Sequence, residues 1–468
     1  MQFVKKYNQE IALALFCVGM LCYALGLSGF GKSLKVQTFF HVGGALFILC
    51  NLALFSKRLW KGLSIPIVCF AIVCALGLLT FFDDVWVRPT SVFLKAVNQH
   101  IITYFALFVL MFIFGMYAKR KYVSAFLICF AILCAMELVA MLYLGFTRGF
   151  LKSSNTPFFF QAVFTYNIWL LAPAAMSLAG MFAFQRKLYK LLALLALVAS
   201  VVAMFANGER SFLVACVAMV FVPFFVWHYK HKFKIIFCVI CAGFIALVSF
   251  YEISKTLPVR YNFAHVVDNF LLVWNTKPSA MGQYDNVCFN PKSGFECTPE
   301  SLVNGKNEIV WEHSALARLN MTKSTLLAVM DSPFKPHLVG VFQIGEYLFH
   351  YYSRTNWENR SYINFDWGSN GYNSPHNFAV SMLFCYGVIG FLSIVVFQGF
   401  LIRSGYRSMR QGGDGYGTFW GLSLIIFVCG ICVQSFFDVL YTNILQCIFI
   451  WCGVLAGLGW RDEAPANN

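Results

Sequence analysis

A histidine beside a long apolar run has the position and type of a general base. His376 lies in Ser374-Pro375-His376-Asn377, directly before the run FAVSMLFCYGVIGFLSIVVF. Ser374 fits a helix N-cap and Pro375 the first helical position, so His376 is expected in the first helical turn. The helix dipole there disfavours a protonated imidazole, and a histidine that is neutral near pH 7 can accept a proton from a hydroxyl. The alternative is a histidine that only satisfies a local backbone group.

Arg210 opens another apolar run, after the turn Asn207-Gly208-Glu209. A cation at a helix N-terminus is electrostatically misplaced unless an anion shares the site. The N–H groups of a helix start and a guanidinium group both suit phosphate oxygens. We therefore predict that Arg210 binds phosphate. The alternatives are an arginine that extends to the membrane surface or one that pairs with Glu209.

Four other charged residues are weaker candidates on spacing alone. Arg318 and Arg260 lie in a long polar segment, where an arginine is commonly an ordinary surface charge. Glu137 lies inside an apolar run, which indicates internal pairing or a polar cavity because an isolated carboxylate is costly in a membrane. Asp438 follows a later apolar run, where its carboxylate fits the role of orienting His376 or one of the arginines.

The energy for any reaction must come with the substrate. The chain contains neither the Walker P-loop pattern nor the H-E-x-x-H zinc pattern. Asp83-Asp84 is an isolated acidic pair and only weakly suggests a metal. We predict no metal and no cofactor, and an activated lipid diphosphate as the kind of substrate that meets this requirement.

The elements that position these residues are transmembrane helices. The chain has 468 residues, of which 59% are hydrophobic and 12% charged, against about 25% charged in soluble domains. Apolar runs recur at lengths that cross the hydrocarbon of a bilayer. The first run follows Lys5-Lys6 without a convincing cleavage site, so we expect a retained helix rather than a secretion signal. The predicted spans are 9–27, 37–55, 63–82, 101–117, 124–145, 168–185, 190–206, 211–227, 235–253, 376–402, 419–436 and 444–460.

The net charge of +15 reflects membrane topology rather than nucleic-acid binding. If the runs alternate in direction, the basic clusters all fall on one side, as the positive-inside rule requires of the cytoplasmic side. Both termini are then cytoplasmic and the ninth span exits outward. The clusters are Lys5 and Lys6; Lys57, Arg58 and Lys61; Lys119, Arg120 and Lys121; Arg186, Lys187 and Lys190; Lys230, Lys232 and Lys234; Arg403, Arg407 and Arg410; and Arg461.

We predict an all-α polytopic membrane protein with about twelve transmembrane helices and one large extracytoplasmic loop domain. Its parts are residues 1–253 with nine spans, the loop domain 254–375, and residues 376–468 with three spans and a cytoplasmic tail. Within the loop, 314–330 is expected to form an amphipathic helix that Asp331-Ser332-Pro333 ends. Cys288 and Cys297 either form a local disulfide, which an oxidising compartment would preserve, or remain free thiols.

Over roughly residues 165–460 the chain resembles the O-antigen ligase family of Gram-negative bacteria. This family is related to the O-antigen polymerases and to the oligosaccharyltransferases that glycosylate proteins en bloc. Its R-x-x-x-L pattern reads R-S-F-L-V at Arg210, and its H-x10-G pattern fits His376 and Gly387. The segments that carry the resemblance are NGERSFLVACVAMV, VRYN, ALARLNMTKSTLLAVMDSPF, SPHNFAVSMLFCYGVIG and QSFFDVLYTNILQCIFIWCGVLAGL.

The resemblance implies a GT-C-like glycosyltransferase of the inner membrane whose active site faces the periplasm. By this resemblance Arg210 and Arg318 bind the diphosphate of an undecaprenyl pyrophosphate-linked O-antigen donor, and His376 deprotonates the acceptor hydroxyl. Arg260 and Asp438 are supporting positions. The implied reaction inverts the anomeric carbon without a metal and moves the glycan en bloc to a lipid A-core sugar.

Three alternatives remain open at this point. An O-antigen polymerase would use the same donor with a growing glycan as acceptor, and a protein O-oligosaccharyltransferase would use a Ser, Thr or Tyr hydroxyl. A flippase or transporter of lipid-linked glycan would need no large asymmetric loop and would depend on intramembrane charges such as Glu137.

Overall fold

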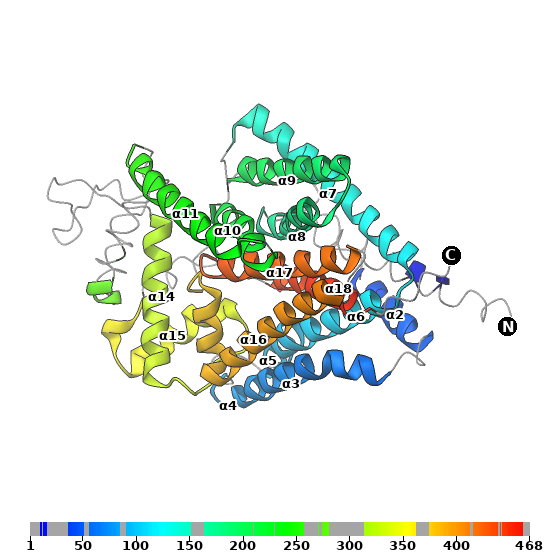
Figure 1. Ribbon diagram of the computed structural model, residues 1–468. Coiled ribbons are helices and arrows are strands. Elements are labelled where there is room, and N and C mark those ends of the chain that lie inside the picture. The colour runs from blue at the N-terminus through cyan, green and yellow to red at the C-terminus, as the bar shows by residue number, and fades with distance from the viewer. Residues whose placement is uncertain are drawn as a thin grey trace.

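The computed structural model describes most of the chain, and every regular element in the described part is a helix (Figure 1). The described residues are 10–11, 13–15, 36–50, 56–84, 90–150, 163–208, 210–228, 230–256, 270, 274–279, 313–361, 374–411, 415–438, 440 and 442–461.

Each predicted span after the first overlaps a helix in the described residues. Within the described residues, eight helices are long and apolar enough to cross a membrane, and Ser211–Val226 and Ile444–Gly459 are shorter apolar helices. The predicted first span, 9–27, lies almost entirely outside the described residues, so the number of crossings stays a prediction. The apolar helices are α2 (Val36–Cys50), α3 (Lys57–Leu79), α5 (Thr90–Val97), the π-helix η2 (Asn98–Ile102), α6 (Thr103–Tyr117), α7 (Arg120–Arg148), α8 (Val163–Ala183), α9 (Lys187–Asn207), α10 (Arg210–Val226), α11 (Lys232–Ser254), α16 (Phe378–Gln411), α17 (Tyr416–Ser435) and α18 (Thr442–Gly459).

Helices α17 and α18 lie in the middle of the bundle (Figure 1). α17 packs against α8, α10 and α16, and α18 packs mainly against α6. Small residues allow this last pair to approach closely, because a Cβ added at Gly453 or Gly457 would meet the backbone of α6. Close backbone approach at small residues is a common way for transmembrane helices to associate without a hydrophobic driving force.

Basic residues from different predicted cytoplasmic segments meet at one end of the bundle. The Arg120 guanidinium carbon lies 4.8 Å from the ring centre of Tyr416, and that of Arg407 lies 3.9 Å from the ring centre of Trp460. From this basic end, α17 runs 20 residues to Ser435, or about 30 Å at the helical rise. The two ends of α17 are therefore separated by about the hydrocarbon thickness of a bilayer.

The loop between α11 and α16 contains α14 (His313–Asp331) and α15 (Ile344–Arg354), which lie together at one end of the helix bundle (Figure 1). The predicted helix 314–330 is confirmed as α14, although the predicted cap Ser314 lies inside it. One face of α14 carries buried polar groups. Ser324 Oγ donates to Asn359 O at 2.6 Å, and Tyr352 Oη donates to Ser324 O at 2.8 Å. These bonds attach α14 to α15 and to the chain that follows it.

Helix α16 is broken at Gly387, which has φ 65° and ψ −177°. The segment that joins α14 to α15 fills the break. Val388 N donates to Pro333 O at 2.8 Å, and His337 N donates to Cys385 O at 3.2 Å. Non-helical backbone within a membrane protein is tolerated where protein buries it and satisfies its polar groups. The break therefore couples the loop to the membrane helix that follows His376.

Gly387→Ala is expected to lower the free energy of unfolding by about 3 kcal/mol, since this backbone region is nearly restricted to glycine and a close contact is added. A Cβ at residue 387 would lie 2.8 Å from Phe334 O. Gly399→Ala on the same helix is the matched control, because a Cβ there meets nothing within 4 Å. Thermal unfolding in detergent measures both variants. Equal melting temperatures for the two would contradict this account of the break.

Candidate active site

His376 and Asp438 form a buried pair at the end of the bundle where α17 finishes. His376 precedes α16, and Asp438 lies in the connection between α17 and α18. His376 Nδ1 and Asp438 Oδ1 are 3.2 Å apart. The two residues are only 8% and 1% exposed. We call them the dyad.

The hydrogen bond within the dyad defines the role of each imidazole nitrogen. A carboxylate accepts, so Nδ1–H of neutral His376 donates to Asp438 and Nε2 carries the lone pair. Asp438 Oδ2 in turn accepts from Ser211 Oγ at 3.4 Å. A carboxylate that holds a histidine in one tautomer and stabilises its imidazolium is the arrangement of general-base pairs in hydrolases. The dyad can therefore take a proton from a hydroxyl group.

The backbone at His376 differs from the sequence prediction. The expectation that Ser374 caps the helix and that His376 lies in its first turn is wrong, because α16 begins at Phe378. Asn377, a residue type strongly preferred at N-caps, accepts from Val380 N through Oδ1 at 3.0 Å. Its Nδ2 also donates to Phe436 O at 3.2 Å, which ties it to the end of α17. Because Asn377 caps α16 and also bonds to Phe436, His376 lies outside the helix.

His376 has φ 39° and is the one non-glycine residue with positive φ among the described residues. Such backbone is uncommon outside glycine and asparagine and costs free energy, which the surrounding contacts must offset. Strain of this kind concentrates at functional sites. In this conformation the imidazole of His376 contacts Asp438.

The pKa of His376 is lowered from its ordinary value near 6.5. Burial is the largest cause, because it disfavours the charged imidazolium, and the positive charge of Arg318 acts in the same direction. The hydrogen bond and the negative charge of Asp438 oppose this by raising the pKa. The predicted neutral histidine thus has a different physical origin from the helix dipole.

Arg318 approaches the dyad from α14. Thr322, one turn further along α14, has its Oγ1 2.7 Å from the carbonyl oxygens of both Arg318 and Pro375. Pro375 directly precedes His376, so this contact attaches α14 to the dyad. The Nε of Arg318 is buried and has no hydrogen-bond partner among the described residues. A buried guanidinium nitrogen without a partner is a position where an anionic ligand would bind favourably.

Arg210 is the first residue of α10, and its neighbour Ser211 touches Asp438. The backbone at Arg210 is therefore one residue from a side chain that contacts the dyad, and α10 begins at the same end of the bundle. Its side chain lies outside what the structure describes. Asn167 on α8 and Asn207 at the end of α9 exchange buried amide hydrogen bonds just before the turn to Arg210. This pair fixes the start of that turn.

The remaining predicted residues lie elsewhere or outside the described part. Arg260, Cys288 and Cys297 are outside the described residues. Glu137 is fully buried on α7, where it interacts electrostatically with Tyr166 on α8. Within the described ranges, no group of three or more His, Cys, Asp or Glu residues is placed to hold a metal.

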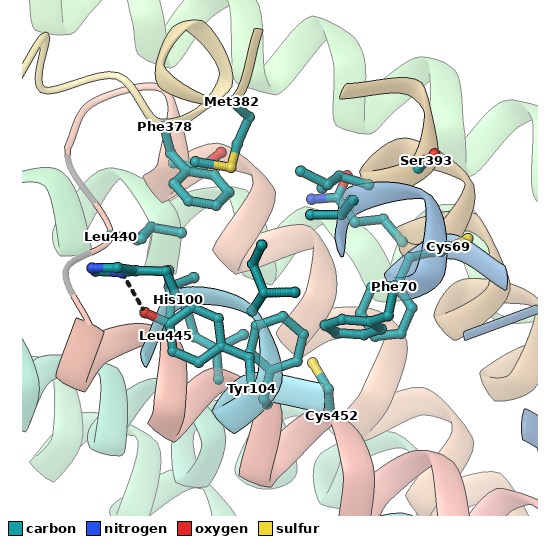
Figure 2. Close-up of a pocket in the computed structure, with 18 of the residues that line it drawn as sticks. Cys69, Phe70, His100, Tyr104, Phe378, Met382, Ser393, Leu440, Leu445 and Cys452 are labelled. Atoms are coloured by element: carbon teal, nitrogen blue, oxygen red, sulfur yellow. Dashed lines mark hydrogen bonds between the residues drawn. The ribbon is translucent and has the colours of Figure 1, made fainter. Parts of the chain in front are cut away.

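An apolar cavity of about 110 Å³ lies within the helix bundle. Phe378 and Leu440 line it, each two residues beyond a dyad member. Figure 2 shows His100 and Leu440 at one end of the cavity and Cys69, Phe70 and Ser393 at the other. The lining residues come from α3, η2, α6, both parts of α16, α17 and α18, and from the connections between α14 and α15 and between α17 and α18. Hydrocarbon is the chemistry that such a lining accepts.

The sequence analysis missed Ser211, Thr322 and Asn377. Ser211 directly follows Arg210, and Asn377 directly follows His376. Their positions beside predicted site residues could have identified them. Nothing in the local sequence distinguishes Thr322, whose contact with Pro375 spans 53 positions.

Residues 195–395 match the O-antigen ligase family model. The match includes Ser211, Arg318, His376 and Gly387, and it ends before Asp438. No curated protein matches the chain significantly. Residues 195–395 therefore match a domain of the O-antigen ligase family, and the chain is a multi-pass membrane protein with eight candidate spans among its described residues.

Proposed function

We propose that the protein is an O-antigen ligase, which transfers a glycan en bloc from undecaprenyl pyrophosphate to a hydroxyl of a lipid A-core sugar. The observation that carries the proposal is the buried dyad of His376 and Asp438 with Arg318 beside it. It combines a general base with a cation at the end of a membrane bundle. The hydroxyl of a sugar acceptor requires the general base, and the diphosphate of a lipid-linked donor requires the cation.

In the proposed reaction, His376 Nε2 accepts the proton of the acceptor hydroxyl while its oxygen attacks the anomeric carbon of the donor. The bond between that carbon and the phosphate oxygen breaks, and lipid diphosphate leaves with the electron pair. Attack opposite the leaving group inverts the anomeric carbon. Asp438 stabilises the imidazolium, and Arg318 stabilises the charge on the diphosphate. Arg210 is a second cation in this proposal, with Arg260 in support.

We call the apolar cavity of about 110 Å³ the α16 cavity. It supports the placement of the donor. Its volume suits a short stretch of hydrocarbon, so the first carbons of the polyprenyl chain enter it and the rest lies in the bilayer. The diphosphate then meets Arg318, and the first sugar reaches the dyad.

The orientation in this proposal follows from charge. Arg120 and Arg407 lie at the basic end of α17, and the dyad lies at the opposite end. The positive-inside rule assigns the basic end to the cytoplasm. The dyad then faces the periplasm of a Gram-negative inner membrane.

Transfer assays with purified protein and lipid-linked glycan test the function. Lipid A-core, a second molecule of lipid-linked glycan, and a peptide with Ser, Thr and Tyr are offered separately. A product with the combined mass of glycan and lipid A-core is expected. A product only with lipid-linked glycan would indicate a polymerase, and one only with peptide would indicate a protein glycosyltransferase. Movement of donor across vesicles without any product would indicate a flippase.

Arg318→Ala is expected to raise the KM for the lipid-linked donor about 10- to 100-fold, as loss of hydrogen bonds to a charged group predicts. Arg318→Lys keeps the charge without the planar fork and should have a smaller effect. Initial rates against donor concentration at saturating acceptor measure this. Arg354→Ala, which removes an exposed arginine of α15, is the control. An unchanged donor KM in Arg318→Ala would show that Arg318 does not bind the diphosphate.

A further inference from the structure

Four arginines from separate parts of the chain meet at the basic end of α17. The positive charges of Arg58 and Arg407 act on each other, and so do those of Arg120 and Arg461. The four residues lie in the first turn of α3 (Arg58), at the start of α7 (Arg120), near the end of α16 (Arg407) and just after α18 (Arg461). We call them the arginine cluster.

Two aromatic rings lie within the arginine cluster. The guanidinium carbon of Arg120 lies 4.8 Å from the ring centre of Tyr416, and that of Arg407 lies 3.9 Å from the ring centre of Trp460. Trp460 Nε1 donates to Ser404 Oγ at 3.2 Å, which holds its ring against α16. Tyrosine and tryptophan are enriched at the boundary between the bilayer and water. The arginine cluster therefore has the surroundings expected at the level of lipid head groups.

Arg461 carries a buried hydrogen-bond donor without an acceptor. Its Nη1 is buried and has no hydrogen-bond partner among the described residues. Burial is the largest cause that lowers the pKa of Arg461; Tyr416 raises this pKa, and the positive charge of Arg120 lowers it. The end of α18 suits a cation because of the helix dipole, but the dipole provides no acceptor for the buried N–H. A buried donor of this kind costs free energy, which an anionic ligand would recover.

No carboxylate neutralises Arg120 or Arg461 within the part of the chain that the structure describes. Glu10 approaches this end of the bundle, but its Oε1 lies 3.9 Å from the Nζ of Lys119. Neither arginine forms an ion pair among the described residues. Two like charges held near each other repel. An anion shared by the two guanidinium groups would replace this repulsion with attraction to both.

We propose that the arginine cluster binds the phosphate head group of an anionic phospholipid, with Arg461 and Arg120 as the two donors. Phosphate oxygens accept the paired hydrogen bonds that a guanidinium group offers. Basic pockets between transmembrane helices are sites where anionic head groups bind. The apolar helices continue from the cluster into the bilayer, so the acyl chains lie along them. This site is separate from the dyad and does not depend on the proposed function.

The charge of the arginine cluster selects among phospholipids. Phosphatidylglycerol has a net negative charge, whereas phosphatidylethanolamine carries an ammonium group beside its phosphate. The guanidinium groups repel that ammonium group, so the anionic lipid should bind more tightly than the zwitterionic lipid with the same acyl chains. Free phosphate has the same oxygens but no hydrocarbon to bury against the helices, so it should bind more weakly than the lipid.

Calorimetry with the purified, delipidated protein in detergent tests the proposal. Dioleoyl phosphatidylglycerol, dioleoyl phosphatidylethanolamine and inorganic phosphate are titrated separately. The wild type is expected to bind phosphatidylglycerol about 10-fold more tightly than phosphatidylethanolamine, as attraction to several basic residues predicts. Arg461→Gln and Arg120→Gln should each weaken phosphatidylglycerol binding about 10-fold, the loss typical of a hydrogen bond to a charged group. Arg461→Lys keeps the charge without the planar fork and should lose less.

Arg403→Gln is the matched control, because it removes an exposed arginine of α16 and changes the net charge equally. It should weaken phosphatidylglycerol binding less than about threefold, since salt screens an exposed charge. Thermal unfolding in lipid-free detergent separates binding from folding. Arg461→Gln should melt no lower than the wild type there, because it removes a buried unsatisfied donor and the repulsion with Arg120.

Three results would overturn the inference. Equal affinity of the wild type for the two lipids would show that the arginine cluster does not select anionic head groups. Equal losses in Arg461→Gln and Arg403→Gln would show that overall charge alone attracts the lipid. Displacement of phosphatidylglycerol by an equal concentration of inorganic phosphate would assign the site to a soluble anion. None of these measurements involves glycan transfer, so a failure of the proposed function would leave them unchanged.

Discussion

Replacing His376 with asparagine is expected to lower the rate of glycan transfer by about 10²- to 10⁴-fold, which is the usual contribution of a general base. Asparagine cannot accept the proton of the acceptor hydroxyl. It tolerates the positive φ of 39° at this position better than most non-glycine residues do. The fold should therefore persist, and donor binding should remain because Arg318 and the α16 cavity are unchanged.

Mass spectrometry of the transfer product at saturating donor and acceptor measures this rate. His376→Ala should lose as much activity but melt at a lower temperature, since alanine is strained at positive φ. His350→Asn, on exposed α15, is the matched control for a histidine-to-asparagine change. Transfer by His376→Asn within a few-fold of wild type would remove the base assignment and the mechanism with it.

Asp438→Asn is expected to reduce kcat by about 10²- to 10⁴-fold, as loss of the orienting carboxylate does in other enzymes with a histidine–carboxylate pair. The amide of asparagine can donate to His376 Nδ1, which favours the tautomer with its proton on Nε2. That nitrogen then cannot act as the base. Ser211→Ala is the matched control, because it removes only the 3.4 Å hydrogen bond to Oδ2 and should cost less than about tenfold. Equal losses in the two variants would mean that Asp438 acts only through packing.

The pH profile gives an independent readout of the same pair. His376 must be neutral to act, and its pKa is lowered below 6.5. The value of kcat/KM in the wild type should therefore be level near pH 7 and fall as the pH drops through a midpoint below 6.5. Asp438 raises this pKa through its hydrogen bond and charge, so Asp438→Asn should lower the pKa of the His376 imidazole further. An acid midpoint above 6.5 in the wild type would contradict the buried neutral histidine.

The helices were predictable because the bilayer selects long apolar runs, and that signal is local. α17 and α18 begin and end within a few residues of the predicted spans 419–436 and 444–460. α14 was also predictable, because a helical pattern followed by Ser332-Pro333 needs no tertiary information.

What could not be predicted depends on contacts between distant segments. The start of α16 was misplaced because Asn377 competes with Ser374 as cap, and Asn377 also bonds Phe436, 59 residues away. The break at Gly387 forms because Pro333 and His337 replace helical hydrogen bonds. The π-helix at His100 has no signature in a uniformly apolar run. The roles of His376 and Asp438 remain proposals, although the structure places the two side chains in contact.

The break in α16 has a consequence for protein engineering. Backbone groups of Val388 and Cys385 bond to residues of the segment between α14 and α15, so the loop and α16 share main-chain bonding that neither can replace alone. Chimeras that exchange acceptor preference between relatives should therefore place their crossover points outside both Pro333–Gly340 and the first half of α16. Grafting the loop without its matching half-helix would leave main-chain amides unsatisfied inside the bilayer.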